Sequence, residues 1–119
     1  MHRIFVYGTL KRGHSNHGYM AGQRFICEAA TQPVYRLFDL GGYPGMVDAA
    51  SDGLSIKGEI WEIDDACLRD LDRLEDVKGG EYARVFVKLA APHESDAVEG
   101  YVYLRSVTRC RDIGSCWGS

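Results

Sequence analysis

The sequence predicts an α+β domain built around a curved, barrel-like sheet. Several short apolar segments alternate in the manner of β-strands. One segment, residues 65–75, has instead the spacing of an amphipathic helix. No repeat, linker or low-complexity tract divides the 119 residues. We therefore expect a single domain over residues 1–119, in which strands dominate.

Short apolar runs that end at turn residues predict the strands before the helix. In chain order these are Arg3–Tyr7, Arg24–Ala30, Val34–Leu40 and Ser55–Ile63. A short helix is expected at residues 16–20, and the segment GGYPG at residues 41–45 is expected to interrupt regular structure. In the last of these strands, Ile60 and Trp61 should lie on opposite faces of the sheet.

The segment Asp65–Glu75 is the one helix that the sequence clearly indicates. Asp64 is a suitable N-cap, because its side chain can accept a hydrogen bond from the first turn, and Asp65 suits the positive end of the helix dipole. Two strands follow, at Tyr82–Leu89 and Val98–Leu104. They can pair across the polar loop between them, which completes the α+β pattern.

The composition indicates a soluble globular protein. The chain is 45% hydrophobic and carries 14 Lys and Arg against 17 Asp and Glu, which gives a formal net charge of −3. No nucleic-acid partner is expected, since phosphate binding needs concentrated positive charge. No apolar run approaches the roughly 20 residues of a membrane span. We expect a cytoplasmic protein that does not bind membranes, and the sequence does not specify its oligomeric state.

Metal binding and serine or cysteine nucleophiles have little support in the sequence. The chain has no GxSxG motif. No cysteine lies in a zinc-type or nucleophile-type local motif, so free thiols are expected at Cys27, Cys67, Cys110 and Cys116. His14 and His17 are only two ligands, so we expect no metal site.

Glu75 occupies an unusual position for a carboxylate. At about 100° per residue it falls between Leu68 and Leu71, inside the apolar stripe of the helix. Desolvation and the negative end of the helix dipole should both raise its pKa, which suits a general acid/base near neutrality. The alternative is that Glu75, at the last helical turn, bends out to water or pairs with Arg84.

The segment Tyr7-Gly8-Thr9-Leu10 is the second candidate for a functional site. A buried strand that stops at a glycine turn exposes consecutive backbone N–H groups, and these can hold a carboxylate or phosphate. The loop GTLKRG matches no glycine-rich nucleotide motif. A simple strand-ending turn is the alternative. Similarly, the segment at residues 43–46 could be a pocket wall or only a turn.

Taken together, four segments resemble the gamma-glutamylcyclotransferase-like superfamily, and most closely its small gamma-glutamylamine cyclotransferase (AIG2-like) branch. They are FVYGTLKRG at residues 5–13, GEIWEI at 58–63, LDRLE at 71–75 and YAR at 82–84. The resemblance extends from residue 3 to about residue 104. The combination of YGTL with a distant LDxxE and YxR is much more specific than any one piece.

The resemblance implies a small mixed β-barrel with short flanking helices. It also implies an enzyme without a cofactor that releases 5-oxoproline from a gamma-glutamyl small molecule. Glu75, the last residue of LDxxE, would be the catalytic acid/base, and Tyr82 would help to position it. The implied substrate-binding residues are Tyr7, Gly8, Thr9, Leu10, Tyr43 and Tyr82.

Two other function classes remain open at this point. A non-catalytic module that binds a small molecule or a protein could keep the same fold and loop. A hydrolase could use Glu75 to activate water, and it would yield free glutamate rather than 5-oxoproline. The leaving-group side of the pocket is expected to be built by residues 105–119 and by the loop around Tyr43, so the physiological substrate is not specified.

Overall fold

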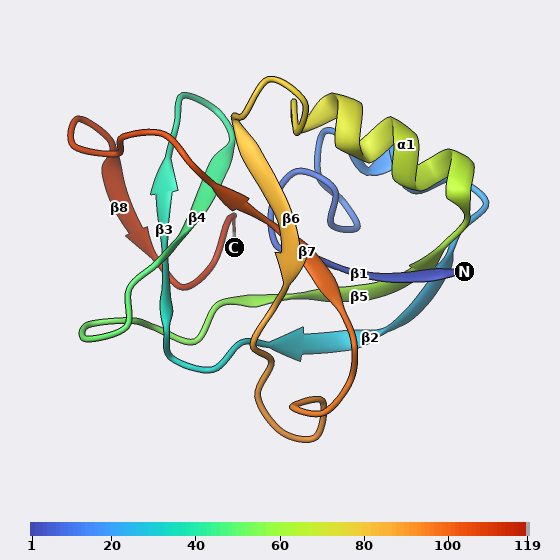
Figure 1. Ribbon diagram of the computed structural model, residues 1–119, viewed down its shortest axis with the longest axis horizontal. Helices are drawn as coiled ribbons and strands as arrows, with labels where there is room; N and C mark the ends of the chain where they lie inside the picture. Colours follow the sequence, from blue (N-terminus) through green and yellow to red (C-terminus); the bar gives the residue numbers. More distant parts are fainter. Residues whose placement is uncertain (119) are drawn as a thin grey trace.

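The computed structural model describes residues 1–118, which fold into two β-sheets, one α-helix and one short 3-10 helix (Figure 1). A five-stranded sheet has the order β2-β5-β1-β7-β6, and a three-stranded sheet has the order β4-β3-β8. The elements are β1 (His2–Val6), η1 (His17–Met20), β2 (Arg24–Ala30), β3 (Tyr35–Asp39), β4 (Pro44–Asp48), β5 (Lys57–Ile63), α1 (Asp65–Leu74), β6 (Tyr82–Phe86), β7 (Glu99–Tyr103) and β8 (Arg111–Gly114).

The larger sheet is mixed, and β1 lies at its centre. β1 pairs antiparallel with β5 along its whole length and parallel with β7 at Ile4 and Glu99. The remaining pairs, including β6 with β7, are antiparallel. The pairing of β6 with β7 confirms the two strands predicted after the helix, although both are shorter than predicted.

The prediction of a barrel is wrong in one respect, because the larger sheet does not close. Its edge strands, β2 and β6, approach each other only beyond their ends, at a single bridge between Thr31 and Leu89. The backbone N–H of Ala90 donates to the oxygen of Ala30 (2.9 Å) beside this bridge. The N–H of Lys88 donates to the hydroxyl of Tyr35 (3.0 Å) rather than to the oxygen of Gln32, so the ladder does not continue there.

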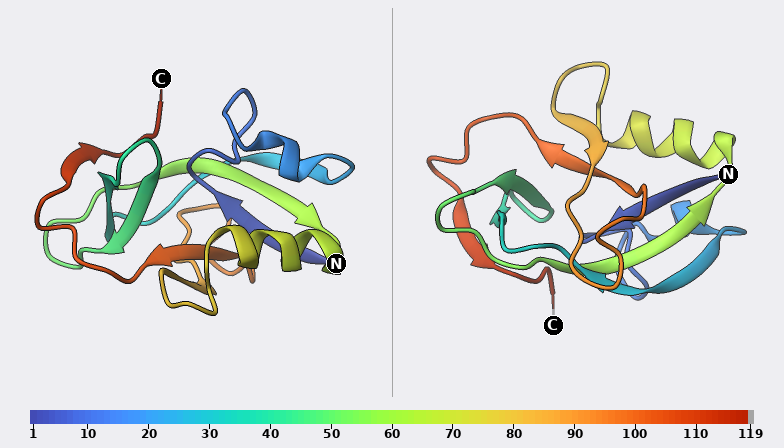
Figure 2. Two further views of the ribbon diagram at one scale, coloured as in Figure 1. Left: turned by 90° about the horizontal axis from the view of Figure 1, so that it is seen from above. Right: turned by 60° about the horizontal axis from the view of Figure 1, so that its bottom comes forward.

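Alternation along β1 divides the core into two layers. Ile4 and Val6 pack on the face covered by α1, where they meet Leu68 and Leu71. Phe5 packs on the opposite face, within the cluster that also contains residues of the three-stranded sheet. Figure 2 shows α1 lying along one side of the larger sheet and the smaller sheet beside it. This arrangement leaves both sheets meeting where β1 ends.

The helix begins as the sequence predicts. The Asp64 side chain accepts a hydrogen bond from the backbone N–H of Cys67 (2.8 Å), which confirms it as the N-cap. The helix ends at Leu74, and Glu75 is its C-cap. Within residues 1–118, neither helix has the length and apolar character needed to cross a membrane.

Two strands were not predicted. β4 begins at Pro44, inside the segment expected to be irregular. Proline is tolerated there because β4 is an edge strand and Pro44 is its first residue. β8 lies in the C-terminal stretch and pairs with β3. It is short and partly exposed, so it lacks the apolar alternation by which a strand is recognised.

Two tyrosine hydroxyl groups connect the two sheets. Tyr7, directly after β1, is buried; its hydroxyl donates to the carbonyl of Tyr101 in β7 (2.8 Å) and accepts from the N–H of Met46 in β4 (3.1 Å). Tyr82 in β6 donates to the carbonyl of Pro44 in β4 (2.8 Å). β4 is thus held against the larger sheet by hydrogen bonds from tyrosines as well as by packing.

We predict that Tyr7→Phe lowers the free energy of unfolding by about 1–3 kcal/mol, because it leaves the buried N–H of Met46 without its acceptor. Urea unfolding measures the change. Tyr19→Phe is the control, since Tyr19 is 44% exposed and the change should stay within about 0.5 kcal/mol. Equal effects of the two substitutions would contradict the bridging role of Tyr7.

Candidate active site

One pocket forms where the end of β1, the start of β4 and the end of α1 meet. Its wall contains all seven residues that the sequence analysis singled out and two more. The lining residues are Tyr7, Gly8, Thr9, Leu10, Tyr43, Pro44, Glu75, Tyr82 and Tyr101. Pro44 belongs to residues 43–46, which the sequence analysis interpreted as a pocket wall or only a turn, and it forms part of the pocket wall. No sequence signal distinguished Tyr101 from an ordinary packing tyrosine.

Glu75 carries the only ionisable carboxyl group in the wall of this pocket. Its backbone N–H donates to the carbonyl of Leu71 (2.9 Å), which fixes the main chain at the end of α1. Its side chain is partly buried and makes no hydrogen bond or ion pair with another residue within 1–118. Arg84 is not its partner, because Arg84 lies 3.0 Å from Asp72 and 3.1 Å from Glu99.

Burial raises the pKa of Glu75 to about 7, and the negative charge of Glu81 adds to the shift. The direction agrees with the sequence prediction, but Glu81 rather than the helix dipole is the second cause. Burial also raises the pKa of Tyr7, Tyr82 and Tyr101, so these hydroxyl groups stay protonated. Near neutral pH, Glu75 therefore changes its charge while the tyrosines around it do not.

Asp72 and Arg84, which belong to the LDxxE and YxR segments, hold α1 against the sheet. The Tyr101 hydroxyl in β7 donates to a carboxylate oxygen of Asp72 in α1 (2.7 Å), and the guanidinium of Arg84 in β6 lies 3.0 Å from the same oxygen. These contacts fix the helix three residues before Glu75. Both residues support the site from behind, since neither lines the pocket.

The loop after β1 presents unpaired backbone donors. The N–H groups of Gly8, Thr9 and Leu10 donate to no acceptor within residues 1–118, although all three residues line the pocket. The loop itself is closed by the N–H of Lys11, which donates to the oxygen of Gly8 (3.1 Å). Consecutive free N–H groups are a suitable site for an anionic oxygen.

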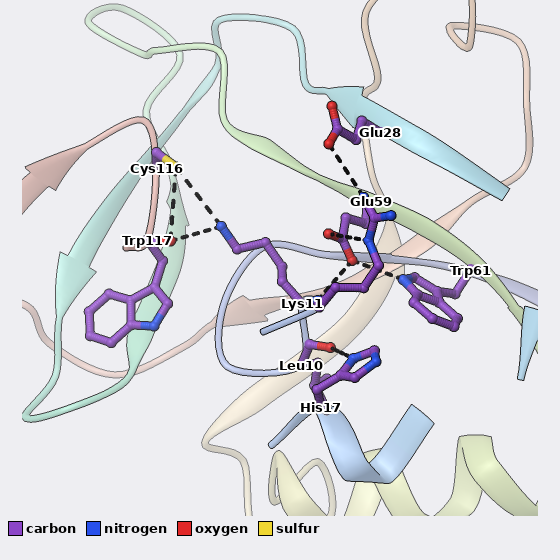
Figure 3. A network of polar contacts seen from close by, with 9 residues as sticks. Leu10, Lys11, His17, Glu28, Glu59, Trp61, Cys116 and Trp117 are labelled. Carbon is purple, nitrogen blue, oxygen red and sulfur yellow. Dashed lines mark hydrogen bonds and ion pairs between the residues drawn. The ribbon is translucent and has the colours of Figure 1, made fainter. Parts of the chain in front are cut away.

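Two charged side chains, neither of which lines the pocket, fasten this loop. The ammonium group of Lys11 donates to the carbonyl of Trp117 in the C-terminal segment (2.8 Å; Figure 3). Arg12 donates to the carboxylate of Glu59 in β5 from both its backbone N–H and Nε (3.2 Å each). Glu59 also accepts from the indole N–H of Trp61 (3.1 Å). The loop is thus held by β5 and by the chain end.

Tyr82 and Gly8 both contact Pro44. The hydroxyl of Tyr82 donates to the carbonyl of Pro44 and makes no hydrogen bond to Glu75. Gly8 must be small because of this neighbour. A Cβ atom at Gly8 would lie 2.6 Å from Cγ of Pro44, well inside van der Waals contact. Gly8 and Pro44 therefore pack against each other in the pocket wall.

A second cavity, of about 300 Å³, adjoins the first, and we call it the outer cavity. The two share Thr9, Tyr43, Glu75 and Tyr82. The other residues that line the outer cavity are Ser15, Asn16, Gly42, Leu74 and Glu81. Tyr43 is present as expected, and its hydroxyl donates to Glu81 (3.0 Å). None of residues 105–118, which were expected to help build the leaving-group side, lines the pocket or the outer cavity.

The cysteines lie away from the pocket. All four are free thiols, as predicted. Cys67, in the first turn of α1, is buried, and burial raises the pKa of its thiol to about 11. Within residues 1–118, no group of three or more His, Cys, Asp or Glu side chains is placed to hold a metal ion.

The geometry agrees with a comparison of the chain with known families. A family model described as gamma-glutamyl cyclotransferase, AIG2-like, matches residues 4–117. The chain belongs to this family. Within it, the Escherichia coli K12 gamma-glutamylcyclotransferase family protein YtfP is 37% identical over 113 residues, which cover 95% of this chain and 92% of YtfP. A Vibrio cholerae relative that carries the gamma-glutamylcyclotransferase name is 45% identical over 76 residues, and the match spans 64% of each chain.

Solved structures of gamma-glutamylcyclotransferase family members have the same fold. The solution structure of Escherichia coli YtfP superposes with a TM-score of 0.70 at 36% identity, over 97% of this chain and 94% of YtfP. A crystal structure of a mouse AIG2-like protein superposes with a TM-score of 0.70 at 33% identity, over 89% of this chain and 78% of the mouse chain. The mixed, strand-dominated fold with one α-helix is therefore a family property.

We predict that Gly8→Ala lowers the free energy of unfolding by about 1–3 kcal/mol, because the added methyl group overpacks the contact with Pro44. Gly18→Ala is the matched control, since a Cβ there meets nothing within 4 Å. Thermal and urea unfolding of both variants measure the difference. A Gly8→Ala variant as stable as Gly18→Ala would show that Pro44 moves aside without cost.

Glu75→Gln should change how stability depends on pH. The folded protein binds the Glu75 proton more tightly than the unfolded chain, so this stabilisation is complete below the ordinary pKa of 4.5 and is lost as pH rises to about 7. The full loss is about 3 kcal/mol. We predict that Glu75→Gln gains stability relative to the wild type over this interval. A difference that is constant between pH 4 and pH 8 would contradict the raised pKa.

Proposed function

We propose that this chain releases 5-oxoproline from a gamma-glutamyl amine or a related gamma-glutamyl compound, with Glu75 as the general acid/base. The observation that carries the proposal is the Glu75 carboxyl group, which is partly buried, unpaired within residues 1–118 and ionises near pH 7. It shares a pocket wall with the loop Gly8–Leu10, which offers unpaired N–H donors. Membership of the gamma-glutamylcyclotransferase family supports the same reaction.

The reaction needs no group beyond those in the pocket. The α-amino nitrogen of the substrate attacks its own γ-carbonyl carbon, a C–N bond closes the five-membered ring, and the C–N bond to the departing amine breaks. Overall, two protons move from the α-ammonium group to the departing nitrogen. Glu75 accepts a proton from the attacking nitrogen and returns one to the leaving nitrogen. A carboxyl group with a pKa of about 7 can do both.

The loop after β1 supplies the complementary donors. Either the α-carboxylate of the substrate or the oxyanion that develops on the γ-carbonyl can accept from the N–H groups of Gly8, Thr9 and Leu10. Because Lys11 and Arg12 fasten this loop to the C-terminal segment and β5, the donors are held in place before the substrate arrives. The tyrosines at positions 7, 43 and 82 form the remaining wall.

A non-catalytic binding module explains Glu75 less well. Burying an unpaired carboxylate costs free energy, and a binding module could carry a neutral residue there without that cost. A hydrolase would use the same residues with water as the nucleophile. The identity of the product distinguishes the two reactions, because hydrolysis yields glutamate and cyclisation yields 5-oxoproline. Incubation with gamma-glutamyl amines, dipeptides and glutathione, followed by detection of 5-oxoproline and glutamate, separates all three functions.

Glu75→Gln should lower kcat/KM by roughly 100-fold or more, because the amide keeps the shape of the carboxyl group but cannot accept a proton. In the wild type, kcat/KM should rise with pH through about 7 as Glu75 ionises. Glu94→Gln, on an exposed loop, is the control. If Glu75→Gln retained activity within a few-fold of the wild type with a matched melting curve, Glu75 would not be the catalyst.

Gamma-glutamyl alkylamines should be better substrates than glutathione. No Lys, Arg or His lines the pocket or the outer cavity, so the terminal carboxylate of glutathione meets no cation there and lies near Glu81. The measurement is the ratio of kcat/KM values for the two substrates. A ratio that favours glutathione would show that an arginine such as Arg105 reaches the cavity.

A further inference from the structure

The outer cavity is lined by Glu75 and Thr9 but not by Gly8 or Leu10, which line only the first pocket, here called the inner pocket. Glu75 thus belongs to the walls of both spaces. In the proposed reaction the acyl group occupies the inner pocket and Glu75 protonates the departing nitrogen. The chain attached to that nitrogen therefore extends into the outer cavity. The residues that line it then select among leaving groups.

Besides Glu75, one acidic or basic residue lines the outer cavity, and that residue is Glu81. One oxygen of Glu81, Oε2, accepts from the hydroxyl of Tyr43 (3.0 Å), and this contact holds the side chain at the cavity wall. The second oxygen has no hydrogen-bond partner, and no Lys, Arg or His forms an ion pair with Glu81 within residues 1–118. The wall thus carries negative charge that the protein does not balance.

Arg105, a basic side chain close to Tyr43, is held elsewhere. Arg105 is close enough to Tyr43 to oppose the rise in its pKa. However, its guanidinium lies 3.8 Å from the carboxylate of Asp76 and donates to the carbonyl of Gly79 (3.5 Å). Arg105 does not line the outer cavity. A cation brought by the substrate would therefore find Glu81 free to accept from it.

We propose that the outer cavity is a leaving-group subsite that selects a second positive charge, so that monoacylated diamines are preferred over neutral alkylamines, with Glu81 as the specificity-determining residue. The predicted preference among substrates rests on the proposed function. An ammonium group at the far end of the leaving chain would donate to the free oxygen of Glu81 in a charge-assisted hydrogen bond. A neutral alkyl chain of equal length would make no such contact.

The kinetic test compares gamma-glutamyl derivatives of 1,4-diaminobutane and of pentylamine, which have chains of similar length. The wild type should favour the diamine derivative by at least about fivefold in kcat/KM, and the preference should weaken with added salt because the subsite is open to solvent. Glu81→Gln should abolish the preference, which is measured as the ratio of the two kcat/KM values within one protein, so that a general change in the reactivity of Glu75 cancels. Derivatives of 1,2-diaminoethane and 1,6-diaminohexane then report the chain length that suits the cavity.

A second readout separates selection by charge from a structural effect. The groups that face Glu75 are Glu81 and the tyrosines at positions 7, 82 and 101, which stay protonated. Because Glu81 is the charged neighbour that raises the pKa of Glu75, Glu81→Gln should move the rise of kcat/KM to lower pH. Glu94→Gln removes an exposed carboxylate and should change neither the preference nor the pH profile.

Titration of the protein with 1,4-diaminobutane alone tests the subsite independently of turnover. Amide shifts at Ser15, Gly42 and Glu81 should report binding to the wild type, and Glu81→Gln should weaken it by at least about fivefold. Equal binding by both proteins, or equal use of the diamine and alkylamine derivatives, would overturn the inference. If no gamma-glutamyl amine gives 5-oxoproline, the proposed function fails, and the titration alone decides whether the diamine subsite exists.

Discussion

The hydroxyl group of Tyr7 is the contact on which the rest of the structure depends. It lies at the end of the central strand, is buried, and bonds at once to the main chain of β7 and of β4. Since β4 belongs to the other sheet, this group helps to set where the two sheets meet, together with the hydroxyl of Tyr82. The pocket is the space left at that meeting point. Tyr7 therefore both joins the architecture and forms part of the cavity wall.

Glu75 illustrates how the fold raises the pKa of a carboxyl group at the cost of stability. A residue at the end of α1 could turn to water, but Asp72 fastens the last helical turn to Tyr101 and Arg84. The backbone of Glu75 is then fixed, and its carboxyl group remains in a wall made largely of tyrosine rings. Those rings exclude water from the carboxyl group and provide no positive charge, so Glu75 keeps its proton up to about pH 7.

Much of the fold and of the candidate site could be predicted because local signals and global structure agree. Asp64 caps the helix, β1 alternates between two core layers, and Glu75 breaks an apolar stripe that the structure does bury. What could not be predicted depends on partners distant in the chain. Pro44 starts a strand only because β3 lies beside it, and the role of Glu81 depends on the hydroxyl of Tyr43. The edges of the larger sheet meet at a single bridge and do not form a continuous ladder, and the periodicity of the sequence does not indicate this.

The contact between Lys11 and Trp117 has a consequence for how the molecule is made. Lys11, in the loop that begins at Gly8, is synthesised 106 residues before Trp117, which is one of the anchors of that loop. β1 likewise waits for β7, which is almost a hundred residues later in synthesis. Such non-local pairing delays folding. During synthesis, the loop that begins at Gly8 therefore lacks one of its anchors until Trp117 has been added.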